Sequence, residues 1–182
     1  MLYIMRHGIT DWNMKHKLQG STDIPLNDEG RAMAAAAAEE YRDMNFDVCY
    51  CSPLKRAHET AELFLKGRNI PIITDDRLTE MGFGDYEGLE YSFNIPDCPI
   101  NVIFQHPEEY KEPIGGSETF EELFKRTGSF LKEVAEPLEK EGKKVLIVAH
   151  GALNSCIINQ RKHLSINDFW STGIPQCKII EI

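Results

Sequence analysis

The sequence lacks any apolar run long enough to cross a membrane. Its longest such run, Ala32–Ala38, falls far short of the roughly 18 residues that a membrane-spanning helix needs. Met1–Met5 is largely apolar, but Arg6 ends it, and the basic-then-apolar order of a signal peptide is missing. These absences argue against an integral membrane protein and against secretion through a leader.

Cysteine is also scarce. The chain of 182 residues holds 5 cysteines, an odd number without a CxxC pair, which argues against a disulfide framework. The histidines, cysteines and aspartates show no metal-ligand spacing either. We therefore expect a reduced, cytoplasmic protein without a bound metal.

Positive charge is the minority charge, with 20 Lys+Arg against 29 Asp+Glu and a net charge of −9. An acidic surface repels the phosphate backbone of nucleic acids and the headgroups of anionic membranes, so neither is an expected partner. A small anionic substrate is still compatible with this balance, because a local basic pocket can outweigh a distant acidic surface.

Short apolar runs alternate with longer amphipathic stretches, which is the pattern of β/α units around a mainly parallel sheet. At this length the pattern predicts a single α/β domain over residues 1–182. Consecutive apolar residues in Lys144–Val148 indicate a central strand covered on both faces. The predicted strands are Leu2–Met5, Asp47–Cys51, Ile72–Thr74, Lys144–Val148 and Cys177–Ile182.

Capping residues mark the starts of the predicted helices. Asn27 is a suitable N-cap, and Ser52-Pro53 offers an N-cap followed by a proline at the first helical position. Thr119 and Glu122 have capping-box spacing at the start of a long amphipathic stretch. The predicted helices cover about 27–41, 52–65, 119–140 and 151–160.

The segment Glu87–Gly116 interrupts this alternation. It is rich in proline and contains two short helical patches but no clear strand. We therefore interpret it as a lid or insertion rather than a linker.

Polar residues directly follow several predicted strands. In an open parallel sheet, ligands bind outside the carboxyl ends of the strands, so these residues should meet on one rim. Glu80 lies in the loop after the third strand. The others are Arg6, His7 and Gly8 after the first strand, Ser52, Lys55 and Arg56 after the second, and His150 and Gly151 after the fourth.

These strand-end residues belong to longer sequence motifs. Together the motifs resemble those of the histidine phosphatase superfamily, the phosphoglycerate mutase-like proteins. A tripeptide such as Arg-His-Gly occurs by chance, but several motifs in family order are specific. The resemblance implies a three-layer α/β/α fold with a mainly parallel central sheet and a small lid. It is carried by Arg6-His7-Gly8-Ile9-Thr10 with Trp12-Asn13, Leu18-Gln19-Gly20, Ser52-Pro53-Leu54-Lys55-Arg56-Ala57, Leu78-Thr79-Glu80 and Val148-Ala149-His150-Gly151.

The resemblance also implies a role for each matched residue. His7 would take the phosphoryl group as phosphohistidine, and Glu80 would be the general acid. The phosphoryl oxygens would be held by Arg6, Arg56 and His150. The further substrate-binding residues would be Thr10, Asn13, Gln19, Gly20 and Gly151.

These residue types suit phosphoryl chemistry on physical grounds. A phosphomonoester carries nearly two negative charges at pH 7, and arginine's planar fork matches its oxygens better than the point charge of lysine. Neutral imidazole is a capable nucleophile, and nearby arginines favour the neutral form of His7. The helix after Gly151 should add the positive end of its dipole.

Several alternatives stay open on the sequence alone. Four other carboxylates are close enough to Glu80 in sequence to compete for the acid role: Asp75, Asp76, Asp85 and Glu87. His150 could be a buried histidine without a catalytic role, and Asn13 and Gln19 could be turn residues.

The matched motifs fit a metal-independent phosphatase, a phosphoglycerate mutase or a non-catalytic phosphate-binding relative. The short segment between Gly88 and Gly115 favours hydrolysis, because the mutases resembled here close the site with a larger insertion. The size is similar to that of α-ribazole phosphatases and broad-specificity phosphatases. We expect a small phosphorylated metabolite as substrate and no cofactor, with 2,3-bisphosphoglycerate required only by a mutase.

The match departs from the family pattern at Ile9, a position without a catalytic role where the family usually has Glu. It also departs in two further places near the site. Lys17 lies where an arginine often precedes the Gln-Gly turn, and lysine lacks bidentate geometry. Ser117-Glu118 follows Gly115-Gly116 in the reverse of the usual order. None of these changes removes the nucleophile, the acid or the second histidine.

Overall fold

In the computed structural model, which describes residues 1–182, a five-stranded sheet is the middle one of three layers. The strand order is β3-β2-β4-β1-β5, and every pair is parallel except β1 with β5. This confirms the predicted α/β/α fold with a mainly parallel sheet. The strands are β1 Leu2–Arg6, β2 Val48–Cys51, β3 Ile72–Thr74, β4 Val145–Ala149 and β5 Ile179–Glu181.

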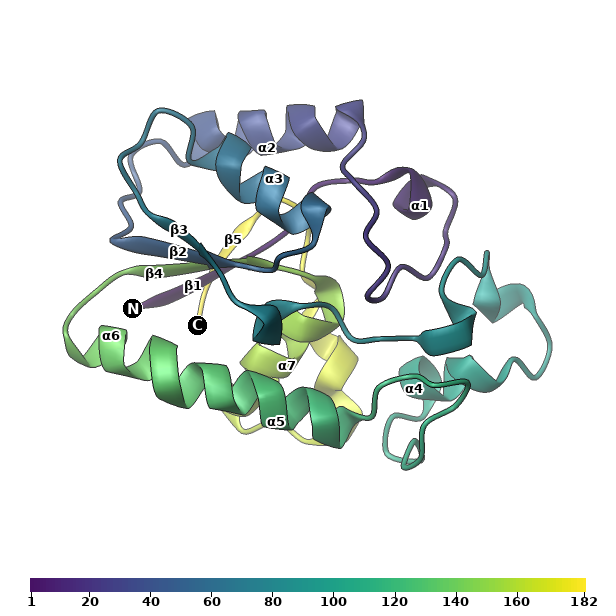
Figure 1. Cartoon of the computed structure of the whole chain (residues 1–182). Helices are drawn as coiled ribbons and strands as arrows, with labels where there is room; N and C mark the ends of the chain where they lie inside the picture. The colour runs from purple at the N-terminus through teal and green to yellow at the C-terminus, as the bar shows by residue number, and fades with distance from the viewer.

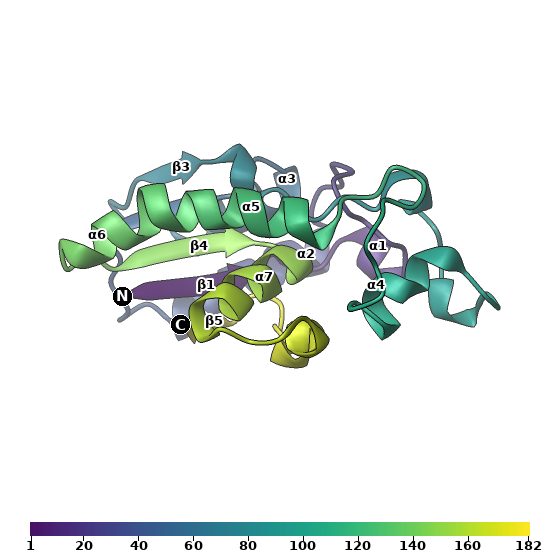
Figure 2. The same cartoon turned by 90° about the horizontal axis from the view of Figure 1, so that it is seen from below.

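Helices cover both faces of this sheet (Figure 1). On one face lie α2 (Asp28–Glu40) and α3 (Lys55–Phe64), and on the other lie α5 (Phe120–Phe130), α6 (Glu136–Lys140) and α7 (Gly151–Lys162). Seen from below, α5 and α7 lie over the sheet, with α5 alongside β4, while the segment that carries α4 (Val102–Gln105) projects beyond one end (Figure 2). The short α1 (Asp11–Met14) lies at this same end.

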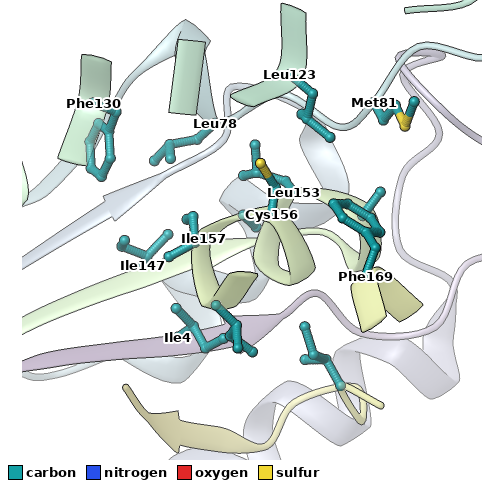
Figure 3. Close-up of a cluster of buried hydrophobic side chains, with 14 of the residues drawn as sticks. Ile4, Leu78, Met81, Leu123, Phe130, Ile147, Leu153, Cys156, Ile157 and Phe169 are labelled. Carbon is teal, nitrogen blue, oxygen red and sulfur yellow. The ribbon is translucent and has the colours of Figure 1, made fainter. Parts of the chain in front are cut away.

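The alternation of side chains along each strand divides the core in two. Leu2 and Ile4 of β1 belong to the larger cluster beneath α5 and α7 (Figure 3), whereas Tyr3 and Met5 belong to the smaller cluster beneath α2 and α3. Successive strand residues point to opposite faces, so a strand covered on both faces must be apolar throughout. The consecutive apolar residues of β4 follow from this position, and all of them are buried.

Two predicted helix details are wrong. The helix after β2 begins at Lys55, and Ser52 does not cap it; the Asp23 carboxylate accepts the Lys55 N–H at 2.7 Å instead. The long helix over 119–140 is interrupted by a π-helical turn at Leu131–Ala135. Pro137, which has no amide hydrogen to donate, lies directly after that turn in α6.

The segment 87–116 contains no strand and only short helical turns, which include Ser92–Asn94, Pro99–Asn101 and α4. It joins the loop after α1 through backbone hydrogen bonds, among them Leu18 N–H to the Leu89 carbonyl at 3.0 Å. A second connection from the C-terminal part, the 3-10 turns of Ile166–Thr172, packs near α7. No helix in the fold combines the length and the apolar character needed to traverse a bilayer.

Candidate active site

A cavity of about 300 Å³ opens at the carboxyl ends of β1, β2 and β4. Polar residues from the strand ends line its inner part, and apolar residues from segments far along the chain line its outer part. The cavity lies where the open-sheet rule places ligands. Its lining consists of Arg6, His7, Asn13, Lys17, Leu18, Gln19, Gly20, Arg56, Glu80, Phe83, Phe104, Gly151, Ala152, Ser155, Trp170, Gly173 and Ile174.

One ring nitrogen of His7 makes a hydrogen bond within the protein, and the other makes none. Its Nδ1 lies 2.6 Å from the Gly8 carbonyl oxygen, and because a carbonyl only accepts, Nδ1 carries the proton. Nε2 therefore keeps its lone pair and makes no hydrogen bond within the protein. Burial, followed by the charges of Arg56 and Arg6, lowers the pKa of His7 well below its ordinary value of 6.5. The side chain is thus a neutral imidazole at physiological pH.

Arg56, at the start of α3, is completely buried. It donates to the carbonyls of Gly20 and Thr22, both at 2.7 Å, while its Nε has no partner. Burial lowers the pKa of Arg56 to about 10, so the group stays charged at neutral pH. No carboxylate forms a salt bridge with it in the fold, which leaves its charge available for an anion.

Arg6, the last residue of β1, also has a guanidinium with unused hydrogen-bond donors. Its Nε is buried without a partner, and the only hydrogen bond of its side chain within the protein is a long one, 3.4 Å, to the Ile174 carbonyl. Burial lowers the pKa of Arg6, and the nearby Glu80 carboxylate partly offsets this. Two under-satisfied guanidinium groups therefore face one cavity, as a site for a multiply charged oxyanion requires.

His150 precedes α7 and is fully buried beside His7, with the two ring centroids 5.2 Å apart. Its Nε2 lies 2.7 Å from the Ser52 hydroxyl, and its Nδ1 has no partner. Burial, followed by the charge of Arg56, lowers the pKa of His150 well below 6.5. His150 itself does not line the cavity; its ring is next to that of His7, which does.

Glu80 lies at the N-terminus of α7. Its Oε1 accepts from the amides of Met81 and Leu153, both at 2.9 Å, and its Oε2 accepts from that of Ala152 at 3.1 Å. The N-terminal amides of α7, which the sequence led us to expect opposite an incoming anion, thus contact the Glu80 carboxylate. Oε2, with a single donor, keeps a lone pair that can carry a proton.

The Glu80 loop is fixed by Glu118, one of the two residues in reversed order. The Glu118 carboxylate forms a salt bridge with Arg126 at 2.6 Å and accepts from the Gly82 amide at 3.2 Å. Arg126 also donates to the Arg77 carbonyl at 2.7 Å. The departure at 117–118 therefore places a structural ion pair behind the acid loop.

Glu87 and Asp85 do not line the cavity. Both oxygens of Glu87 are occupied by the backbone and hydroxyl groups of Ser21 and Thr22, and the Phe83 amide donates to it at 3.0 Å. Glu87 thus ties the loop after α1 to the loop after Glu80. Asp75 and Asp76 do not line it either, so Glu80 is the only one of the competing carboxylates that faces the cavity.

The residues assigned to substrate binding separate into two groups. Asn13, Gln19, Gly20 and Gly151 line the cavity, whereas Thr10 is fully buried and does not. Thr10 caps α1, and its hydroxyl lies 2.9 Å from Gln19 Oε1. Its position is thus that of a support for the binding loop.

Sequence reasoning did not find the outer part of the cavity or the contact of Ser52 with His150. Ser52 directly follows β2, so the strand-end rule marked its position, but capping propensity directed it to a helix. Phe83, Phe104 and Trp170 form an aromatic wall with Ile174. Nothing in the local pattern distinguishes these four from core residues.

Comparison with known proteins places the whole chain in one group. The family described as histidine phosphatase superfamily (branch 1) matches residues 2–182. A Bacillus subtilis protein described as an uncharacterized phosphatase, PhoE, is 38% identical over 157 residues, covering 86% of this chain and 75% of that protein. A 2,3-bisphosphoglycerate-dependent phosphoglycerate mutase of Cytophaga hutchinsonii is 32% identical, covering 97% and 85%.

Solved structures have the same fold. Bacillus stearothermophilus YhfR superposes with a TM-score of 0.85 at 32% identity, covering 100% of this chain and 90% of that one. A mycobacterial glucosyl-3-phosphoglycerate phosphatase in complex with VO3 also gives a TM-score of 0.85, at 27% identity, covering 98% and 90%.

Proposed function

Because the chain belongs to the histidine phosphatase superfamily, we propose that it hydrolyses small phosphomonoesters through a phosphohistidine formed at His7. The observation that carries this proposal is the state of the His7 ring, whose Nδ1–H is fixed on the Gly8 carbonyl while Nε2 is free beside two charged arginines. A neutral nitrogen lone pair next to an oxyanion site is the arrangement that in-line attack on phosphorus requires.

In the first step, the Nε2 lone pair forms a bond to phosphorus and the bond between phosphorus and the ester oxygen breaks. The leaving alkoxide takes the proton carried by Glu80 at Oε2. The ring gains positive charge as the P–N bond forms, and the Gly8 carbonyl at 2.6 Å stabilises it. Arg6 and Arg56 neutralise the phosphoryl oxygens; unit charges about 4 Å apart interact by about 4 kcal/mol at an effective dielectric of 20.

In the second step, the Glu80 carboxylate takes a proton from water, and the resulting hydroxide attacks phosphorus as the P–N bond breaks. His7 leaves as neutral imidazole and inorganic phosphate is released, so the enzyme returns to its starting protonation state. The cavity lining contains one imidazole, one carboxylate and no thiol. Such a donor set suits acid–base work rather than metal coordination, and we expect activity in excess chelator.

A phosphoglycerate mutase is the second candidate, because relatives described as 2,3-bisphosphoglycerate-dependent mutases match nearly the full chain. The same His7, Arg6 and Arg56 would serve it, with the phosphoryl group returned to the substrate instead of to water. Two features of this chain favour hydrolysis. The insertion is short, and the outer cavity holds a single cation, Lys17, whose ammonium lies 3.4 Å from Glu90.

The covalent step is tested by labelling. Protein incubated with a phosphorus-32 ester and quenched in base should carry an acid-labile, base-stable label. His7→Ala should carry none, while His58→Ala, which changes a partly exposed histidine on α3 outside the cavity, should be labelled like the wild type. A label of wild-type intensity on His7→Ala would overturn the assignment.

Hydrolase and mutase are separated by phosphorus NMR in excess chelator, with 3-phosphoglycerate, several phosphomonoesters and a trace of 2,3-bisphosphoglycerate. Growth of inorganic phosphate is the expected result. A 2-phosphoglycerate signal without free phosphate would identify a mutase.

A further inference from the structure

We propose that the alcohol part of the substrate is apolar and uncharged, and that it binds against the aromatic wall formed by Phe83, Phe104 and Trp170. This inference rests on the proposed phosphatase function, since it concerns the group that leaves when the phosphoryl group is transferred. It assigns a leaving-group subsite to the outer part of the cavity.

Phe104 is the centre of the wall. Its ring centroid lies 5.6 Å from that of Phe83 and 5.1 Å from that of Trp170. The only polar atom of the Trp170 side chain, Nε1, donates to the Ile103 carbonyl at 2.8 Å. The indole therefore offers no free hydrogen bond to a ligand, and the wall presents only carbon to the cavity. Leu18, Ala152 and Ile174 extend the same lining.

Apolar surface continues from the cavity to the outside of the insertion. Phe93 packs edge-to-face with Phe104, with ring centroids 5.5 Å apart, and is 58% exposed. An exposed phenylalanine packed against the wall of a cavity widens the apolar area that a bound group can contact. Large exposed apolar groups adjoining a cavity are a mark of a ligand surface.

The charges at this end of the cavity favour an uncharged group over a second anionic one. Lys17 is the only cation outside the arginine pair, and its ammonium lies 3.4 Å from Glu90 and 5.7 Å from the Trp12 ring centroid. A carboxylate or second phosphate on the substrate would have to displace Glu90. It would also have to leave water for an aromatic wall that offers it no donor, which is costly.

The inference is tested with three esters of primary alcohols, so that Glu80 assists similar leaving groups. The esters are 2-phenylethyl phosphate, glycerol 3-phosphate and 3-phosphoglycerate. We expect kcat/KM for the phenylethyl ester to exceed that for glycerol phosphate by about 10- to 100-fold, as burial of one aromatic ring implies. The phosphoglycerate should be the poorest substrate.

Variants of the aromatic wall measure how much it contributes to the preference for the phenylethyl ester over glycerol phosphate. Phe104→Ala should reduce the ratio of the two kcat/KM values about tenfold, and Phe104→Leu, which keeps most of the apolar volume, should reduce it less. Tyr91→Ala is the matched control, because Tyr91 is an exposed aromatic of the same insertion that does not line the cavity. Its ratio should equal that of the wild type.

The outcomes separate this inference from the proposed function. Hydrolysis of all three esters with a ratio near one, or with 3-phosphoglycerate preferred, would overturn the apolar subsite and leave the phosphatase intact. Absence of phosphate release from every ester, together with no label on His7, would overturn the function itself.

A second inference comes from a separate contact: we propose that Ser52 is a positioning residue that fixes the tautomer of His150. The Leu54 amide donates to Ser52 Oγ at 3.3 Å, and His150 Nε2 is 2.7 Å from the same oxygen. If the hydroxyl donates to Nε2, the only unpaired atom is His150 Nδ1 with its proton. If Nε2 donates instead, both the hydroxyl proton and the Nδ1 lone pair lack partners, which buried groups avoid.

The favoured arrangement makes His150 a hydrogen-bond donor through Nδ1. This atom is fully buried without a partner, on a ring 5.2 Å from that of His7. A neutral histidine with the proton on Nδ1 can donate to a phosphoryl oxygen bound at His7, whereas the other tautomer would direct a lone pair toward it. Ser52 acts through His150 and does not line the cavity.

Nitrogen-15 NMR of the unliganded wild type tests this directly, and it needs no variant to fold. We expect a protonated Nδ1 and an unprotonated Nε2 for His150. In Ser52→Ala the two tautomers should exchange, and kcat should fall about tenfold with KM little changed. A proton on Nε2 in the wild type, or an unchanged spectrum in Ser52→Ala, would overturn the inference.

Discussion

The two ends of the cavity differ in the chemistry of the side chains that line them and in the contacts that hold these side chains in place. The inner end is lined by charged and polar groups such as Arg56 and His7, which are almost completely buried and held by backbone carbonyls. The outer end is lined by aromatic rings held mainly by contact with one another: Phe83 is buried, and Phe104 and Trp170 are half-buried. These rings come from the loop after Glu80, from the insertion and from 166–172.

Under the proposed function, this difference assigns chemistry and selectivity to separate parts of the fold. The groups proposed to react project from or near strand ends that the sheet holds in register. The wall belongs to connections outside the sheet, where loops vary with little cost to the core. A change at the inner end should therefore alter the rate for every ester, and a change at the outer end should alter the ranking of esters.

The largest expected effect is that of Arg56→Met. It removes one of two charges that neutralise the phosphoryl group, and kcat/KM should fall about 1,000-fold, which corresponds to about 4 kcal/mol. Arg56→Lys should lose less, since it keeps the charge but not the fork. Arg161→Met is the matched control, because Arg161 pairs with Glu139 away from the cavity. Similar losses in both Met variants would show that the effect comes from folding rather than from the site.

A comparison of Glu80→Gln with Glu87→Gln tests whether facing the cavity decides which carboxylate is the acid. Glu80→Gln should slow alkyl phosphates about 100-fold and nitrophenyl phosphate far less, because a good leaving group needs no proton. Glu87→Gln should lower the free energy of unfolding by about 1–3 kcal/mol, because hydrogen bonds are lost. Any change in rate should be the same for alkyl phosphates and nitrophenyl phosphate. Both are measured by steady-state kinetics and urea unfolding. The opposite pattern would assign the acid role to Glu87.

The buried histidines should make stability depend on pH in a defined window. The pKa values of His7 and His150 are lowered by burial, so only the unfolded chain takes up protons at these sites just below about pH 6.5. The free energy of unfolding is then greatest above that pH. It should fall as the pH decreases, with a slope approaching about 1.4 kcal/mol per pH unit for each histidine.

Urea unfolding between about pH 7.5 and pH 5.5 measures that slope. His7→Asn should have about half the slope of the wild type, since one of the two groups is removed. An equal slope in the two proteins would mean that His7 is protonated in the folded state.

The smallest expected effect is the difference in free energy of unfolding between two glycine variants. It concerns the loop that Arg56 binds at the inner end of the cavity. Gly20 has φ +57°, and a Cβ there would overlap Glu87 Oε1, whereas a Cβ at Gly67, with φ +78°, would meet nothing within 4 Å. Gly67→Ala should cost about 1 kcal/mol for the left-handed backbone alone. Gly20→Ala should cost at least about 1 kcal/mol more through the clash. Equal losses in urea unfolding would show that the Gly20 loop is free to move.

The alternation of apolar runs along the chain determined most of the fold. Each predicted strand is present to within two residues of its expected ends, and Thr119 and Asn27 cap their helices as predicted. Local rules failed where a residue had a competing tertiary partner. Ser52 contacts His150 instead of capping α3, and Asp23, distant in sequence, takes over the cap.

The sequence by itself also determined which residues form the inner end of the cavity. Arg6, His7 and Arg56 directly follow strands or begin the next helix, and parallel strands bring their carboxyl ends to one edge of the sheet. Their convergence therefore follows from local position and strand direction alone.

Only the tertiary structure decided which carboxylate faces the cavity and what forms its outer wall. Glu80 and Glu87 lie close together in the chain, but one contacts the amides of α7 and the other those of the Ser21–Thr22 turn. The wall joins Trp170 to α4 through a hydrogen bond that spans 67 residues. Such contacts depend on how separate connections pack beyond the sheet, and no periodicity within a segment encodes the neighbour that another segment will supply.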